Sequence, residues 1–334
     1  HNSESAGGRR PPAIAWFSIL ATFSVFRGFI MNPKHIIESQ QFTVPLLMEL
    51  FERTRQMEKI VARGGTRDYE QKILATLFYQ PSTRTRFSFE AAMLRLGGKL
   101  LSTEQAGVFS SAIPGEHLED TVRVIANNCD VIVLRHNEEG ATARAASVSS
   151  VPVINAGEGP GGQHPTQALL DLYTIYDECK TLDGLSVALV GALGKSRTGR
   201  SLTYLLGKFD RVRLYFVAPP QMQISPDILA YLDRHEVSYE LADSPEDVLP
   251  RVDVVYQKPI DRTRKHEDIN LATYNIGTDS LSRMKQNAIV MHALPRGAEI
   301  DPLVDRDPRA AYFRQSRNGL FVRMALLTLL FEGE

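Results

Sequence analysis

Short apolar runs that alternate with helical patterns constrain the fold of this chain most strongly. Residues 73–77 have the composition of a buried strand, and a polar turn separates them from a helical pattern at residues 90–96 that stops at two glycines. The same order recurs with further apolar runs at residues 130–134, 151–156, 185–191, 212–217, 252–256 and 288–292. This alternation predicts right-handed βαβ units. We therefore predict an α/β fold of two doubly wound parallel-sheet domains with a ligand cleft between them.

The polar turn at residues 78–89 has the composition of a phosphate site. Ser82, Thr83, Arg84 and Thr85 fall where a strand ends and a helix begins. At such a junction, free backbone N–H groups and the positive end of the helix dipole point outward. The three hydroxyls and the guanidinium add further donors, which predicts an anion cradle without a glycine-rich loop.

Other polar side chains follow the predicted strands in the same way. They are Arg135, His164, Gln167, Arg197, Lys258 and Arg296. Ligands of open parallel sheets bind beyond the carboxyl ends of the strands, so these groups should meet in one cleft. Arg197 lies at a predicted helix start, where the dipole disfavours a cation, which indicates an anionic partner.

Four motifs along the chain resemble the aspartate/ornithine carbamoyltransferase family. They are Pro-Ser-Thr-Arg-Thr-Arg at residues 81–86, Leu-Arg-His at 134–136, His-Pro-Thr-Gln at 164–167 and Leu-Pro-Arg at 294–296. The resemblance spans about residues 32–331 and is closest to the catalytic chain of the aspartate branch. It implies transfer of the carbamoyl group of carbamoyl phosphate to the amine of an amino acid, with release of phosphate. It also implies a homotrimer and no metal or other cofactor.

The resemblance also implies domains and residue roles. Residues 31–165 would bind carbamoyl phosphate, residues 166–315 would bind the acceptor, and a helix at 316–334 would pack back on the first domain. Carbamoyl phosphate would be held by Ser82, Thr83, Arg84, Thr85, Ser110, Arg135, His164 and Gln167, of which Thr85, Arg135 and His164 would polarise the carbonyl oxygen. The acceptor would be bound by Arg197, Lys258, Asp261, Leu294 and Arg296.

Departures from the family pattern concentrate in the acceptor half. Pro114 stands where the family brings a loop lysine from a neighbouring subunit, and Pro259 and Asp261 replace an arginine and a glutamine that hold aspartate. Three readings stay open. The chain carbamoylates another amine, such as a diamino acid that Asp261 would suit; it is an aspartate carbamoyltransferase of pyrimidine biosynthesis in which Lys258 partly replaces the lost arginine; or it is an inactive paralogue with a structural or regulatory role.

Composition limits the partners and the compartment. The 334 residues carry a net charge of −1, which argues against nucleic acid or a membrane surface as the main partner. Two cysteines without CxxC spacing favour a reducing compartment, which predicts the cytoplasm. Residues 1–30 place arginines before a short apolar run, so they are interpreted as a non-native or processed extension, a targeting segment or a docking element.

Overall fold

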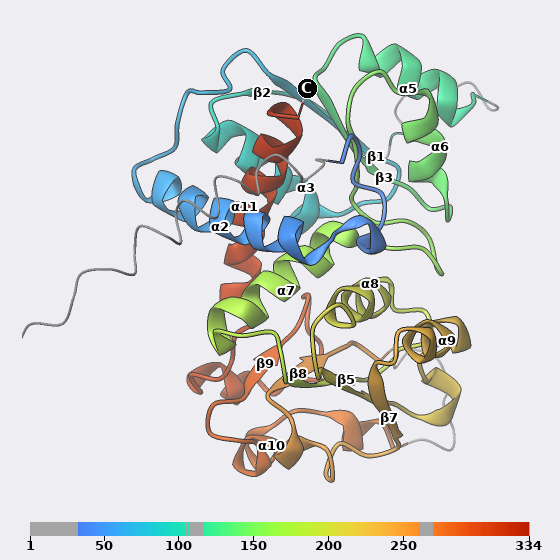
Figure 1. Ribbon diagram of the computed structural model, residues 1–334, viewed down its shortest axis with the longest axis vertical. Coiled ribbons are helices and arrows are strands. Elements are labelled where there is room, and N and C mark those ends of the chain that lie inside the picture. Colours follow the sequence, from blue (N-terminus) through green and yellow to red (C-terminus); the bar gives the residue numbers. More distant parts are fainter. Residues whose placement is uncertain (1–32, 105, 107–115, 261–269, 334) are drawn as a thin grey trace, which may run out of the picture. The chain divides into compact units, whose positions relative to one another are not determined.

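Two parallel β-sheets form the framework of the chain (Figure 1). The computed structural model describes residues 33–104, 106, 116–260 and 270–333. The strand order is β2-β1-β3-β4 in the first sheet and β7-β6-β5-β8-β9 in the second, and every pairing between named strands is parallel. This confirms the predicted fold of two parallel α/β sheets.

The first sheet is built around the apolar run predicted to be a strand. Its strands are β1 (Ile73–Phe78), β2 (Lys99–Glu104), β3 (Val131–Arg135) and β4 (Val153–Asn155). The helices that accompany it are α2 (Val44–Ala62), α3 (Thr83–Arg95), α5 (Leu118–Ala126), α6 (Ala141–Val148) and α7 (Pro165–Cys179). Phe78 is paired with Arg135 in the register of β1 and β3, so the polar residues that follow both strands emerge at one edge.

The second sheet repeats this arrangement with one more strand. Its strands are β5 (Ser186–Val190), β6 (Arg213–Val217), β7 (Ser238–Ala242), β8 (Val254–Gln257) and β9 (Ile289–Met291). Its helices are α8 (Arg197–Leu206), α9 (Pro226–Arg234) and α10 (Thr278–Arg283). Short 3₁₀ turns lie at Ser39–Gln41, Pro220–Met222, Leu249–Arg251, Leu271–Tyr274 and Pro302–Arg306.

The central strands are apolar because they are covered on both faces. All four residues of β8 are buried, as are four of the five residues of β5. Continuous apolar runs are typical of parallel strands with helices on both sides. The edge strand β7 is only partly buried, and it was not revealed by the search for apolar runs because polar residues interrupt its sequence.

The last helix, α11 (Tyr312–Phe331), returns to the first sheet. It packs against α2, α3 and α7, and Figure 1 shows it in red beside α2 and α3. It begins four residues before the predicted start at residue 316, and every residue from Phe321 to Phe331 is buried. The predicted domain boundaries at residues 165/166 and 315/316 stay a prediction.

Candidate active site

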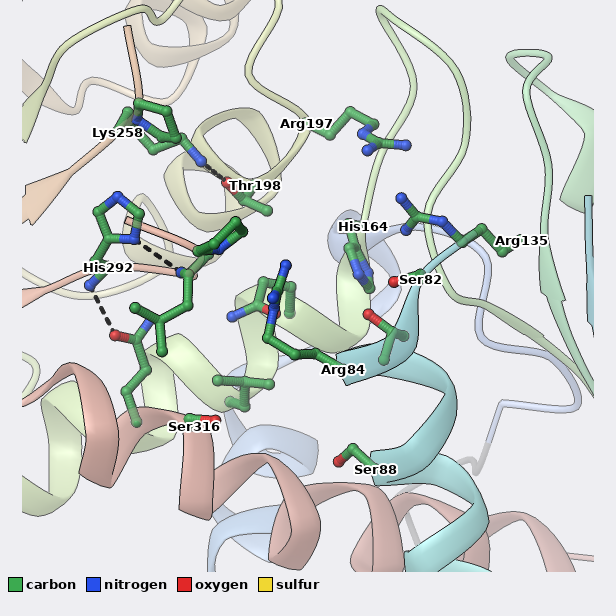
Figure 2. A pocket seen from close by; sticks show the side chains of 18 of the residues that line it. Ser82, Arg84, Ser88, Arg135, His164, Arg197, Thr198, Lys258, His292 and Ser316 are labelled. Carbon is green, nitrogen blue, oxygen red and sulfur yellow. Dashed lines mark hydrogen bonds between the residues drawn. The ribbon is translucent and has the colours of Figure 1, made fainter. Parts of the chain in front are cut away.

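The start of α3 is shaped to receive an anion. Ser82 is the N-cap residue, yet its side chain makes no capping hydrogen bond, and no acid lies in the first helical turn. The hydroxyl and the first N–H groups of the helix are therefore available to a ligand, and the helix dipole adds positive potential there. Thr85 is buried, whereas Arg84 is exposed and projects into the open space of the site (Figure 2).

Arg135 faces this helix from the end of β3. Its Nη1 donates a hydrogen bond to the carbonyl oxygen of Ala156 at 3.0 Å. Burial, together with the charges of Arg197 and Arg84, lowers the pKa of the Arg135 guanidinium to about 10, so it remains cationic at neutral pH. Gly157 makes this position possible, because its φ is +112° and a Cβ there would lie 2.7 Å from Arg135 Nη1.

His164 is the N-cap residue of α7 and supplies a neutral imidazole. Its backbone N–H donates to Ser201 Oγ at 3.0 Å, which ties α7 to α8. Burial, reinforced by Arg135 and other nearby cations, holds the pKa of His164 well below its usual value. A neutral imidazole keeps one N–H, so it can donate to a carbonyl oxygen without carrying charge.

A buried carboxylate orients Gln167. Asp171 Oδ1 accepts from Gln167 Nε2 at 2.8 Å and from Gln315 Nε2 at 2.6 Å, and its Oδ2 accepts from the Tyr256 hydroxyl at 2.7 Å. Since the Gln167 amide nitrogen is turned toward Asp171, its oxygen is left to accept a hydrogen bond in the site. Asp171 is fully buried, and burial raises its pKa to about 6 despite these three bonds.

Two cations form the opposite side of the site. Arg197 begins α8, and its Nη1 donates to the backbone oxygen of Glu158. Lys258 follows β8; its ammonium group donates to Thr198 Oγ1 and lies 5.5 Å from the centre of the Tyr256 ring. Lys258 is only 8% exposed, and burial lowers its pKa to about 8. A lysine held this deeply requires compensating negative charge or hydrogen bonds.

The turn after β9 is held by a buried histidine and glutamate. His292 Nδ1 accepts from the backbone N–H of Leu294 at 2.8 Å, so its Nε2 carries the proton that is donated to Glu299 Oε1 at 3.0 Å. Leu294 has a φ of +54° and precedes a cis-proline. This network fixes the backbone of Leu294 beside the site.

These groups surround one cavity of about 300 Å³. The predicted residues that line it are Ser82, Arg84, Thr85, Arg135, His164, Gln167, Arg197, Lys258 and Leu294 (Figure 2). Thr83 is exposed outside the lining, and Arg296 forms an ion pair with Asp305 and a hydrogen bond with Tyr312 instead. Ser110, Pro114 and Asp261 lie outside the described residues.

Sequence reasoning missed several residues that belong to the cavity. Gln315, Ser316 and Arg323 come from α11, and Asp171 lies just behind the lining. Asp171 had a recognisable signal, since it follows Gln167 by four residues and so lies on the same helix face. The α11 residues had none, because only tertiary packing brings that helix to the cavity.

The chemistry of the lining is dominated by positive charge. It carries five cationic side chains and no aspartate or glutamate among the described residues: Arg84, Arg135, Arg197, Lys258 and Arg323. Among those residues, no three His, Cys, Asp or Glu side chains gather as metal ligands would. No described helix is long and apolar enough to cross a bilayer. The cavity can therefore bind a strongly anionic ligand and polarise a carbonyl group with a neutral imidazole and a guanidinium.

The fold and the site together define an α/β protein with two parallel sheets and an anion-binding cavity at the strand ends. The carbamoyl-phosphate-binding domain of aspartate/ornithine carbamoyltransferases matches residues 34–177, and the Asp/Orn-binding domain matches residues 183–330. The chain therefore belongs to the aspartate/ornithine carbamoyltransferase family and is a carbamoyltransferase, as its sequence motifs indicated.

Individual relatives support the same assignment. A chloroplastic aspartate carbamoyltransferase of Arabidopsis thaliana is 51% identical over 304 residues, which cover 89% of this chain and 78% of that protein. The aspartate carbamoyltransferase catalytic subunit of Methanocella arvoryzae is 44% identical over 302 residues, with 89% and 97% covered.

Solved structures agree with these relatives. The catalytic subunit of M. jannaschii aspartate transcarbamoylase superimposes with a TM-score of 0.83 at 41% identity, covering 90% of this chain and 98% of that chain. The Trypanosoma cruzi enzyme in complex with carbamoyl phosphate and aspartate gives a TM-score of 0.83 at 35% identity, with 89% and 95% covered.

Proposed function

We propose that this protein transfers the carbamoyl group of carbamoyl phosphate to the amine of aspartate, a reaction of pyrimidine synthesis. The observation that carries this proposal is the cavity lining, which combines five cations with no described carboxylate. Such a lining suits a dianionic phosphate and a dicarboxylate acceptor together. Relatives of about 50% identity are named aspartate carbamoyltransferases, which supports the same acceptor.

In this proposal the donor binds at the start of α3. The phosphate group accepts hydrogen bonds from Ser82, Thr85 and the free helix N–H groups, and Arg84 neutralises its charge. Arg135 and the neutral imidazole of His164 donate to the carbonyl oxygen. Gln167, turned by Asp171, accepts from the carbamoyl NH₂ group. Fixed donors of this kind stabilise the oxyanion that forms in the transition state.

The transfer then needs no nucleophile from the protein. The neutral amine of the acceptor attacks the carbonyl carbon and forms a C–N bond, which yields a tetrahedral oxyanion. The C–O bond to phosphate breaks, and the departing phosphate takes the proton that the amine loses. The protein contributes by holding the amine close to the carbon and by stabilising the oxyanion.

The acceptor half favours aspartate over a diamino acid. The preference for a cationic acceptor rested on Asp261, which lies outside the described residues. Lys258 and Arg197, by contrast, add two cations to the cavity lining, which supports an acceptor with two carboxylates. We assign Lys258 the role of the arginine that Pro259 has replaced; Arg296 would take part only if it left its ion pair with Asp305.

The test uses purified protein, carbamoyl phosphate and a panel of amines. We expect phosphate release and a carbamoylated product with aspartate, and no product with ornithine or 2,4-diaminobutyrate. The variant His164→Asn, prepared in the same way, excludes a contaminating host enzyme. If product forms only with a diamino acid, the chain carbamoylates a cationic acceptor instead of aspartate. If no amine gives product, the chain is an inactive paralogue.

We further propose a homotrimer, as the family resemblance implies. Phe87 and Leu94 lie seven residues apart on one face of α3 and are 56% and 59% exposed, with exposed Leu101 on the neighbouring strand β2. A contiguous group of large exposed apolar side chains is typical of a subunit contact. Sedimentation equilibrium of the wild type and of Leu94→Glu tests this assembly, with a lower mass expected for the variant.

Localisation is a separate proposal. Plant relatives are named chloroplastic, and the basic and apolar residues at positions 9–26 have the composition of a targeting segment. We propose that this segment directs the chain to an organelle rather than leaving it in the cytoplasm. A fluorescent fusion with and without residues 1–30 tests this, and identical cytoplasmic distributions would contradict it.

A further inference from the structure

Arg323 is a buried cation that the reaction scheme above does not use. It lies on α11, is 4% exposed and lines the cavity. Its Nη1 donates to Ser88 Oγ at 2.8 Å, its Nε has no hydrogen-bond partner, and its guanidinium carbon lies 5.0 Å from the centre of the Phe89 ring. Within the described part of the chain, no carboxylate lies at ion-pair distance from it.

Burial of the Arg323 guanidinium destabilises the folded protein unless its charge is compensated. A buried charge normally has a counter-charge and a full set of hydrogen bonds, because desolvation disfavours it strongly. Burial lowers the pKa of Arg323 to about 10, so it is still cationic at neutral pH. The charge of Asp171 offsets part of this cost, yet that carboxylate is already shared by three other donors.

A glycine inside α11, Gly319, leaves room for the side chain of Arg323. Gly319 lies one turn earlier on α11, and a Cβ there would lie 2.7 Å from Arg323 Nη1. Glycine is less favourable than alanine inside a helix, because it loses more backbone freedom when it is ordered. This explains why residue 319 is a glycine although it lies inside a helix.

The position of Arg323 points to the donor side of the cavity. Ser88, its hydrogen-bond partner, lies on α3 one turn after Arg84, and Figure 2 shows both side chains projecting from successive turns of that helix. Arg323 therefore places a charge against α3, the helix whose first turn carries the phosphate motif. A bound dianion there would supply the counter-charge that Arg323 lacks.

We propose that Arg323 is an additional anion-binding residue for the phosphate group of the donor, supplied by the C-terminal helix. This inference rests on the proposed function for the identity of the donor. It adds one cation from α11 to the hydroxyls and guanidinium of residues 82–85, and it makes donor affinity depend on the packing of α11 against α3.

Calorimetry with inorganic phosphate and with phosphonoacetamide, a stable donor analogue, tests the proposal. Arg323→Met should keep its fold, because a buried charge can be replaced by an apolar side chain of similar volume. We expect it to bind both ligands about 10- to 100-fold more weakly, as for loss of one charge-assisted contact, and Arg323→Lys to recover part of the affinity. Succinate binding at saturating phosphonoacetamide should be unchanged.

Gly319→Ala supplies a second, independent test. In the wild-type background it should weaken phosphonoacetamide binding, because the new methyl group displaces the Arg323 guanidinium. In the Arg323→Met background it should have no effect on binding and should raise the melting temperature. The proposal would be overturned if Arg323→Met bound phosphate and phosphonoacetamide as tightly as the wild type. It would also be overturned if the variant bound succinate more weakly but the donor ligands with unchanged affinity. If wild type binds neither ligand, the proposed carbamoyl transfer fails instead.

Discussion

The buried charge of Lys258 should lower the free energy of unfolding, although it supports binding of the acceptor. The variant Lys258→Met separates these two effects. The ammonium is buried, and its pKa falls from 10.5 to about 8. A shift of one pKa unit corresponds to about 1.4 kcal/mol, so the charged form is disfavoured by up to about 3 kcal/mol at neutral pH. Methionine fills a similar volume without charge. The variant should therefore be more stable than the wild type by up to about 3 kcal/mol at pH 7.

The pH dependence of this stability has a defined sign. Between pH 8 and 10.5 the unfolded chain holds a proton on Lys258 that the folded chain has lost. Stability of the wild type therefore rises with pH across this window, because the unfolded state binds more protons. The variant lacks this rise. Urea denaturation should therefore show that the difference in unfolding free energy between Lys258→Met and the wild type is largest at pH 7 and close to zero at pH 10.

The functional effect of Lys258→Met should have the opposite sign. If Lys258 binds a carboxylate of aspartate, the lost charge-assisted hydrogen bond is worth about 1.5–3 kcal/mol. We expect kcat/KM for aspartate to fall about 10- to 150-fold at saturating carbamoyl phosphate. KM of the wild type for aspartate should rise above pH 8 as Lys258 loses its proton, and the variant should show no such rise.

Lys208 provides a matched control. It is half-buried, burial lowers its pKa, and its ammonium donates to the backbone oxygen of Gln40 at 3.2 Å, away from the cavity. Lys208→Met should leave kcat/KM for aspartate unchanged. The reasoning is refuted if Lys258→Met lowers stability at pH 7 and leaves KM for aspartate at the wild-type value.

Three further predictions concern groups behind the lining. Asp171→Ala leaves three buried donors without an acceptor and should cost about 3–5 kcal/mol of unfolding free energy in urea, whereas Asn, which keeps one acceptor oxygen, should cost less. Burial raises the pKa of Glu299, but its hydrogen bonds lower it to about 2, against 4.5 when unfolded. Wild-type stability should therefore fall between pH 4.5 and 2, and acid titration of Glu299→Gln should lack that fall. Gly157→Ala should weaken phosphonoacetamide binding at least about tenfold in calorimetry, because its Cβ would displace Arg135. Gly140→Ala, which also has a positive φ but open space around it, is the control.

The local part of the site could be predicted from sequence because its signals are contiguous. The strand that ends at Phe78 and the helix that begins at Thr83 are encoded within about twenty residues, and the phosphate turn lies between them. Likewise, His164 precedes a proline at the first position of α7, which marks a helix start. Family motifs then identified most of the lining.

The rest depends on long-range packing that no local pattern records. Arg323 reaches the cavity only because α11 packs on α3, 235 residues earlier in the chain. Lys258 was predicted to lie in the cleft, but no local pattern indicated that it would be almost fully buried. The edge strand β7 and the short helices α6 and α10 were missed for a different reason, since each is short and holds few large apolar side chains.

The return of α11 to the first sheet has a consequence for synthesis of the chain. Residues 73–86, which form β1 and the phosphate turn, leave the ribosome well before α11, the helix that packs against α3. Until α11 emerges, the first sheet lacks a helix that packs against α2, α3 and α7, and the cavity lacks the charge of Arg323. The donor site is therefore complete only after α11 has been translated, and a premature stop before residue 323 would remove the Arg323 charge from it.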